Sequence, residues 1–98
     1  MNNGNLGKQK DFESFGSVFQ NNVIYASLLD TDFFKKNYTI CKSSYFTTDP
    51  HHQLWKIITA FYDKYKSVPT FDSLKIEISK LERESLVSGC FNIIEEIQ

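Results

Sequence analysis

The residues of this sequence best suited to chemistry are two adjacent histidines, two cysteines and two close aspartates. His51 and His52 are neighbours, so on a helix their side chains point about 100° apart and cannot hold one metal ion together. Neither has the partner four residues away that a helical zinc site uses. We expect His51 to face the core with one ring nitrogen satisfied, and His52 to face solvent.

The other candidates also point away from catalysis. Cys41 and Cys90 match no CxxC or Cys/His spacing, which predicts two free thiols in a reducing cytoplasm. Asp30 and Asp32 are better explained as helix caps than as a metal pair. No phosphate-binding GxxxxGK(S/T) loop occurs. We therefore expect no catalytic residues, no metal or cofactor site, and neither binding nor hydrolysis of ATP by this chain.

Charge and hydropathy narrow the range of partners. The chain has 11 basic and 12 acidic residues, a net charge of −1 and no basic block. This balance argues against a stand-alone nucleic-acid binder, which needs a positive surface. Lys35, Lys36 and Lys42 form a basic cluster that is better explained as a solvated loop. No apolar run approaches the roughly 20 residues of a membrane span, and no secretory signal is present, so we expect a cytoplasmic protein without membrane contact.

Residues 49–81 organise the rest of the chain, because they predict two amphipathic helices joined by a turn. Asp49 can cap the first helix, Pro50 suits its first position, and Pro69 ends it. The apolar residues of this helix cover an arc of about 160°, which predicts one broad buried face. They are Leu54, Ile57, Ile58, Phe61, Tyr62 and Tyr65, with Trp55 at the edge. Trp55 is therefore either buried or placed at the rim of an interface.

The second of these helices is expected to begin after Thr70, a suitable N-cap. Its apolar residues form one stripe: Phe71, Leu74, Ile78 and Leu81. Ile76 lies nearly opposite this stripe. It is either an ordinary exposed apolar residue or part of a second contact face.

The helix expected over residues 17–30 is apolar on more than one side. Val18, Tyr25 and Leu29 lie together, whereas Ile24 and Leu28 lie on the other side. Such a helix is buried from several sides, either at the centre of a bundle or between the core and a partner chain. We therefore predict that the chain self-associates, as a dimer. The candidate residues for a self-association or partner surface are Ile24, Leu28, Ile76 and Trp55.

The remaining segments complete a small all-α bundle of about five or six helices. Residues 1–14 are polar and predict a flexible tail, which leaves residues 15–98 as the folded domain. Asp30 caps a short helix with Phe33 and Phe34, residues 37–41 form an extended connection, and residues 43–46 form one helical turn with its rings inward. The last helix covers residues 82–98, with this apolar face: Leu86, Val87, Cys90, Ile93, Ile94 and Ile97.

The end of that last helix predicts that the chain was cut from a longer protein. Glu95 and Glu96 occupy the final turn, where the helix dipole disfavours negative charge. No Gly or Asn follows as a C-cap.

A longer motif runs through the centre of the chain. An aromatic pair is followed by a short polar gap, a Pro-His pair and an aliphatic-aromatic pair: Tyr45-Phe46, Pro50-His51 and Leu54-Trp55. A proline turn (Val68-Pro69-Thr70) and a leucine-bearing helix follow, and upstream residues 24–30 are followed by Phe33. Over roughly residues 20–81, this pattern resembles the N-terminal domain of DnaB-like replicative helicases. The Phe, Tyr, Asn and Lys content is more similar to phage members, and the Gly-Gly entry that bacterial members share after position 81 is missing.

The resemblance implies a DnaB N-terminal-domain-like collar domain over residues 15–98, without the family's ATPase motor. Such a domain is a non-catalytic assembly and partner-binding part of a hexameric replicative DNA helicase. It would pair with itself in a ring and contact primase or a helicase loader. The parent chain would be an ATP-dependent DNA helicase acting in DNA replication with ATP and Mg²⁺, in the host cytoplasm if it is a phage protein.

Two other functions compete with this one. The first is a small helical adaptor unrelated to helicases. The second is a helix-turn-helix DNA reader, which is the weakest because its reader helix would carry Asp72, Glu77 and Glu82 beside Lys75 and Lys80.

Overall fold

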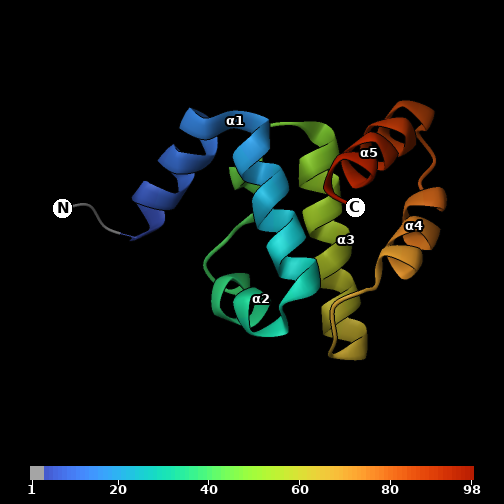
Figure 1. Cartoon of the computed structure of the whole chain (residues 1–98), viewed down its shortest axis with the longest axis horizontal. Coiled ribbons are helices and arrows are strands. Elements are labelled where there is room, and N and C mark those ends of the chain that lie inside the picture. Colours follow the sequence, from blue (N-terminus) through green and yellow to red (C-terminus); the bar gives the residue numbers. More distant parts are fainter. Residues whose placement is uncertain (1–3) are drawn as a thin grey trace.

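Between residues 4 and 98 the chain folds into five α-helices and one short 3-10 helix (Figure 1). A computed structural model describes the backbone of these residues and the side chains of residues 16–98. The elements are α1 (Gly4–Leu29), α2 (Thr31–Tyr38), η1 (Ser43–Tyr45), α3 (Asp49–Tyr65), α4 (Phe71–Ser79) and α5 (Glu84–Ile97). Residues 4–98 contain no strand, which confirms the predicted all-α class.

The first helix is longer than predicted and is kinked. Its helical backbone begins at Gly4, whereas the sequence predicts a helix from residue 17. The kink lies at Gly16, whose φ of 67° and ψ of −153° are open to glycine because it has no Cβ. Residues 4–14 of the predicted flexible tail therefore have helical backbone, whereas residues 1–3 and the side chains of residues 1–15 lie outside the described part.

Two of the predicted caps are present. Asp30 accepts a hydrogen bond from the backbone N–H of Phe33 at 3.1 Å and begins α2. Thr70 accepts one from the backbone N–H of Ser73, also at 3.1 Å, and begins α4. Each satisfies one of the N–H groups that the first turn of a helix leaves free. Both predictions are confirmed.

Both ends of α3 differ from the prediction by a few residues. Thr48, not Asp49, is the N-cap, and Asp49 instead occupies the first turn, where the helix dipole favours a negative charge. The helix ends at Tyr65, before Pro69, because Lys66 takes the left-handed conformation (φ 61°, ψ 25°). Pro69 lies buried in the connection to α4.

α3 is the central element of the bundle. It contacts α1, α4, α5 and η1, and Figure 1 shows it between α1 on one side and α4 and α5 on the other. Its Leu54, Trp55 and Ile58 are buried, whereas Tyr65, at the far end of the predicted buried arc, is exposed. The Trp55 indole Nε1 donates a hydrogen bond to the backbone carbonyl of Cys41 at 3.0 Å. Trp55 is therefore a core residue rather than a rim residue.

The stripes predicted for α4 and α5 contribute to the core, although Phe71 and Leu81 are only half-buried. Leu74 and Ile78 of α4 are fully buried, and α5 buries Cys90, Ile93 and Ile94. α5 begins at Glu84, two positions later than predicted. No helix in the described part of the chain is both long enough and apolar enough to cross a membrane.

The segment between α2 and α3 is more helical than predicted. α2 continues to Tyr38, so that only the end of the 37–41 stretch is a connection. η1 turns Tyr45 and the following Phe46 into the core, as predicted.

Candidate functional site

Between residues 17 and 29, the exposed side of α1 carries apolar residues and no charge. Val18, Tyr25 and Leu29 recur at helical spacing on this side, with exposed fractions of 69%, 40% and 59%. The other exposed residues here are Ser17 and Asn22, and residues 17–29 include no charged side chain. The centres of protein interfaces are depleted of charge in the same way. We call this surface the α1 face and treat it as the first candidate site.

The opposite side of α1 is held inward by polar side chains. Gln20 Nε2 donates a hydrogen bond to Thr47 Oγ1 at 2.7 Å, and Gln20 Oε1 accepts one from the Thr47 backbone N–H at 3.1 Å. Ile24 and Leu28 follow Gln20 by one and two turns, and both are buried. The sequence separates the two apolar sides of α1 correctly, but the structure places these two candidate surface residues in the core.

The other two candidate residues lie in different environments. Trp55 is only 1% exposed, whereas Ile76 is 59% exposed on α4, opposite its buried stripe as predicted. α4 lies on the other side of α3 from α1, so Ile76 does not extend the α1 face (Figure 1). Of the four candidates, Ile76 alone is accessible to a partner without opening of the domain.

A polar network ties three helices together beside the α1 face. His51 Nδ1 lies 2.6 Å from Thr48 Oγ1, and His51 Nε2 lies 2.5 Å from Asn21 Oδ1. Asn21 Nδ2 donates a hydrogen bond to Glu96 Oε1 at 3.2 Å. Both ring nitrogens of His51 therefore have a partner, where the sequence predicts one. The network also gives Glu96 a hydrogen-bond donor. This contact stabilises a negative charge in the last turn of α5, where the helix dipole disfavours it.

Burial controls the proton affinity of this histidine. His51 is buried, and burial lowers its pKa from the ordinary value of 6.5, although the negative charge of Glu96 acts in the opposite direction. A neutral imidazole fits the contacts, because Nε2 can donate to the Asn21 oxygen while Nδ1 accepts from the Thr48 hydroxyl. His51 is thus a structural core residue, as predicted.

A hollow of about 450 Å³ lies beside this network. It is lined by the following side chains: Val18, Asn21, Asn22, Tyr25, Glu96 and Ile97. The lining joins the α1 face to the end of α5, so that a partner on this face would also meet Ile97 and Glu96.

The remaining reactive side chains are at least partly buried, including His52, which was expected to face solvent. His52 is half-buried, with Nδ1 2.9 Å from the Ser43 carbonyl oxygen. Cys41 and Cys90 are free and buried, and burial raises the pKa of Cys90 to about 11. Among the described residues, no three His, Cys, Asp or Glu side chains are grouped so that they could hold a metal ion.

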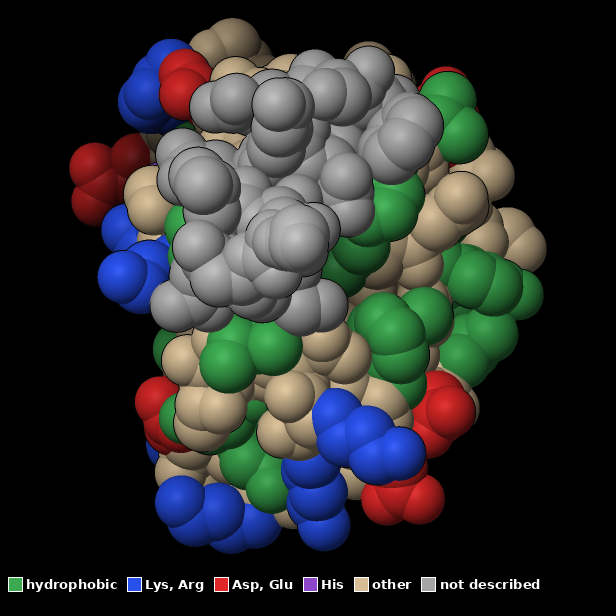
Figure 2. All heavy atoms as spheres, turned by 90° about the vertical axis from the view of Figure 1, so that its left-hand side faces the viewer, with side chains coloured by type: hydrophobic (Ala, Val, Ile, Leu, Met, Phe, Trp, Pro, Cys, Tyr) green, Lys and Arg blue, Asp and Glu red, His purple; other side chains and the backbone are tan. Residues whose placement is uncertain are grey.

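The basic cluster is exposed to solvent, as predicted, but Lys35 and Lys36 lie in the last turn of α2 rather than in a loop. Lys35, Lys36 and Lys42 are all exposed. Figure 2 shows Lys and Arg side chains at the end of the molecule where α2 and the C-terminal end of α3 lie, with hydrophobic side chains higher on the same view.

Comparison of the chain with protein-family models, with curated proteins and with solved structures finds no match. A function must therefore be inferred from the α1 face and from the sequence resemblance over residues 45–81.

Proposed function

We propose that this chain is a non-catalytic assembly and partner-binding domain, and that the α1 face pairs with a second copy. The observation that carries the proposal is the exposure of Val18, Tyr25 and Leu29 within residues 17–29, which include no charged side chain. Burying apolar area between two copies removes it from water. Residues 17–29 carry no charge, so this part of the face can meet its copy without like charges opposing each other, which suits a symmetric dimer.

We further propose that the parent protein is a DnaB-like hexameric replicative helicase, in which this domain belongs to the collar. Support comes from the resemblance over residues 45–81 and from the all-helical fold. Four of the residues that carry the resemblance occupy core positions, since Tyr45, Phe46, Leu54 and Trp55 are buried. In such a parent, primase or a helicase loader is the partner, and DNA, ATP and Mg²⁺ are bound by the rest of the chain. The protein would then act in DNA replication, in a cytoplasm that belongs to the host if the parent is from a phage.

Two substitutions with matched exposure test the assembly proposal. Leu29 and Ile76 are both 59% exposed, but only Leu29 lies on the α1 face. We expect the wild-type chain to dimerise with increasing concentration in light scattering, Leu29→Glu to remain monomeric, and Ile76→Glu to dimerise like the wild type. A wild-type chain that stays monomeric at high concentration would refute self-association. Loss of dimerisation in Ile76→Glu alone would assign the interface to α4 instead.

The helicase proposal has a separate test. The reading frame that encodes this chain should continue beyond Gln98 into a GxxxxGK(S/T) phosphate loop. A frame that ends without such a loop would favour the alternative, a small helical adaptor unrelated to helicases. Dimerisation through the α1 face is compatible with either parent, so the two tests fail independently.

A further inference from the structure

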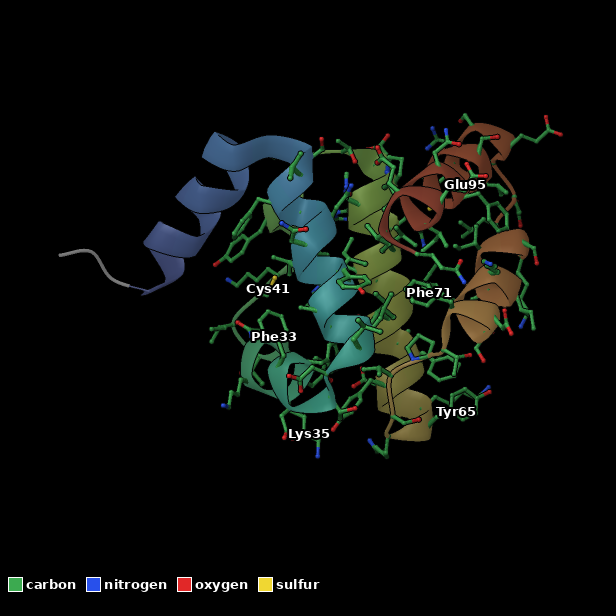
Figure 3. All side chains as sticks on the ribbon, viewed as in Figure 1. Phe33, Lys35, Cys41, Tyr65, Phe71 and Glu95 are labelled. Atoms are coloured by element: carbon green, nitrogen blue, oxygen red, sulfur yellow. The ribbon has the colours of Figure 1, made fainter. Side chains whose placement is uncertain are left out.

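A groove runs between α3 and α4, away from the α1 face. On the α3 side its lining residues recur every three to four positions, so they form one face of the helix. The apolar part of this lining is Ile57, Ala60, Phe61 and Tyr65. The groove has a volume of about 360 Å³, which is room for bulky side chains rather than for a folded domain. Figure 3 shows Tyr65 at the end of α3, on the side toward α4.

Basic side chains surround this apolar floor. Lys56 and Lys64 come from α3, and Lys80 comes from α4. Glu77 also lines the groove and pairs with Lys80, with 3.1 Å between Nζ and Oε2. Three lysines and one glutamate give the groove a net charge of +2, whereas the whole chain has a net charge of −1. The groove is therefore positively charged, although the chain as a whole is slightly negative.

Two of these lysines have no carboxylate partner in the described part of the chain. Lys56 forms no ion pair there, and the Lys64 ammonium lies 5.2 Å from the centre of the Tyr65 ring. A cation in this position is attracted weakly to the ring and remains available for an incoming carboxylate. In general, a lysine stem covers neighbouring apolar surface while its charged end stays in water, so such lysines suit the rim of an apolar groove.

We infer that this groove binds an acidic amphipathic segment of a partner protein. The apolar side chains of that segment would pack on Ile57 and Phe61, and its carboxylates would pair with Lys56 and Lys64. Binding of an amphipathic segment in a groove between helices uses apolar anchors for affinity and rim charges for orientation. The inference does not depend on the α1 face, because the groove shares no residue with it.

The groove fits a peptide better than single-stranded nucleic acid. Nucleic acid needs exposed aromatic faces on which bases can stack. The Tyr65 ring is already engaged by the Phe61 ring, at 4.5 Å between centroids, and by the Lys64 ammonium. The other two floor residues, Ile57 and Ala60, are aliphatic, which suits Leu or Phe side chains rather than the flat faces of bases.

Fluorescence anisotropy with a labelled synthetic peptide tests this inference. The probe is a fluorescein-labelled peptide in which glutamates flank a leucine and a phenylalanine. We expect saturable binding that weakens with added salt, because exposed charge pairs are screened. The double substitution Lys56→Glu/Lys64→Glu should weaken binding about tenfold, since two attractive contacts become repulsive. The matched control Lys35→Glu/Lys36→Glu makes the same change of charge on α2, where Figure 3 shows Lys35 away from the groove, and should bind within about twofold of wild type.

A second variant tests the apolar floor. Ala60 is exposed in the groove, so Ala60→Trp should leave the fold intact and block the floor, and it should weaken peptide binding about tenfold. A peptide with glutamine in place of glutamate should also bind more weakly. The inference is overturned if the wild type binds no acidic peptide, or if both double variants lose binding equally. It is also overturned if an unlabelled oligothymidylate binds the groove more tightly than the peptide, since the groove would then be a nucleic-acid site.

Discussion

Trp55 is the residue whose replacement tests the described core most directly. It is 1% exposed, and its indole packs against Phe34 and Phe46 with ring centroids 5.6 Å and 5.4 Å away. Its Nε1 also donates to the Cys41 carbonyl oxygen at 3.0 Å, which fixes the connection between α2 and η1 against α3. Two substitutions separate these contributions, because Trp55→Ala removes the ring and the hydrogen bond, whereas Trp55→Phe removes the hydrogen bond but keeps a large part of the aromatic ring.

The expected magnitudes follow from this environment. Truncating a fully buried aromatic to alanine costs about 3–5 kcal/mol of unfolding free energy. Taking the indole N–H away from a buried carbonyl costs about 1–3 kcal/mol, so Trp55→Phe should be clearly less destabilised. The total free energy of unfolding of a small domain is about 5–15 kcal/mol. Trp55→Ala should therefore be marginally folded or unfolded, while Trp55→Phe remains folded.

Urea denaturation followed by far-ultraviolet circular dichroism measures both values, and light scattering on the same samples measures association. We expect Trp55→Phe to unfold at a lower urea concentration and to self-associate like the wild type. If Trp55→Phe kept wild-type stability but became monomeric, Trp55 would lie in an interface, and the assignment of the buried face of α3 would be wrong. Unchanged stability of Trp55→Ala would refute the same assignment.

Two further substitutions test the polar network and the contact between α3 and α5. Because burial lowers the pKa of His51 in the folded domain, the unfolded chain binds the proton more readily, and the free energy of unfolding should fall as the pH drops below about 6.5. In urea titrations at several pH values, His51→Gln should flatten this dependence. A wild-type free energy of unfolding that does not change with pH would contradict the prediction. Gly89→Ala should destabilise the domain by about 1–3 kcal/mol, because the added Cβ would lie 2.5 Å from Cγ of the Pro50 ring. The neighbouring exposed change Ser88→Ala should stay within about 0.5 kcal/mol in the same assay, and a Gly89→Ala variant as stable as wild type would show that the two helices approach less closely.

Local signals in the sequence predicted the helices and several of their ends. The Thr70 cap and the α4 stripe need only neighbouring residues, so the pattern alone was sufficient. The end of α3 was misplaced because Lys66, a residue with no strong turn preference, takes the left-handed conformation before Pro69 is reached. Helix termini are set by such single conformational choices, which periodicity does not detect.

The orientation of α1 and the groove could not be read from local pattern. Residues 17–29 contain no charged side chain, so nothing marks the solvent side of this helix. The buried side is set by Gln20 and Thr47, which are 27 positions apart. The groove likewise needs α3 and α4 to meet before Lys64 and Lys80 share a surface. Both features come from contacts between elements. The sequence pattern did place Val18 and Tyr25 on one side of the helix, but it did not show that this side is exposed.

The two buried cysteines provide built-in reporters of local opening. A thiol reacts with an alkylating reagent as the thiolate, and at Cys90 burial suppresses this form by raising the pKa to about 11. Cys41 lies where the α2–η1 connection meets Trp55, whereas Cys90 Sγ lies 3.7 Å from the Pro50 carbonyl oxygen between α3 and α5. Labelling rates of the two thiols in the native protein therefore measure how often each half of the bundle opens. The domain can report its own regional stabilities under native conditions, without an introduced probe or a denaturant.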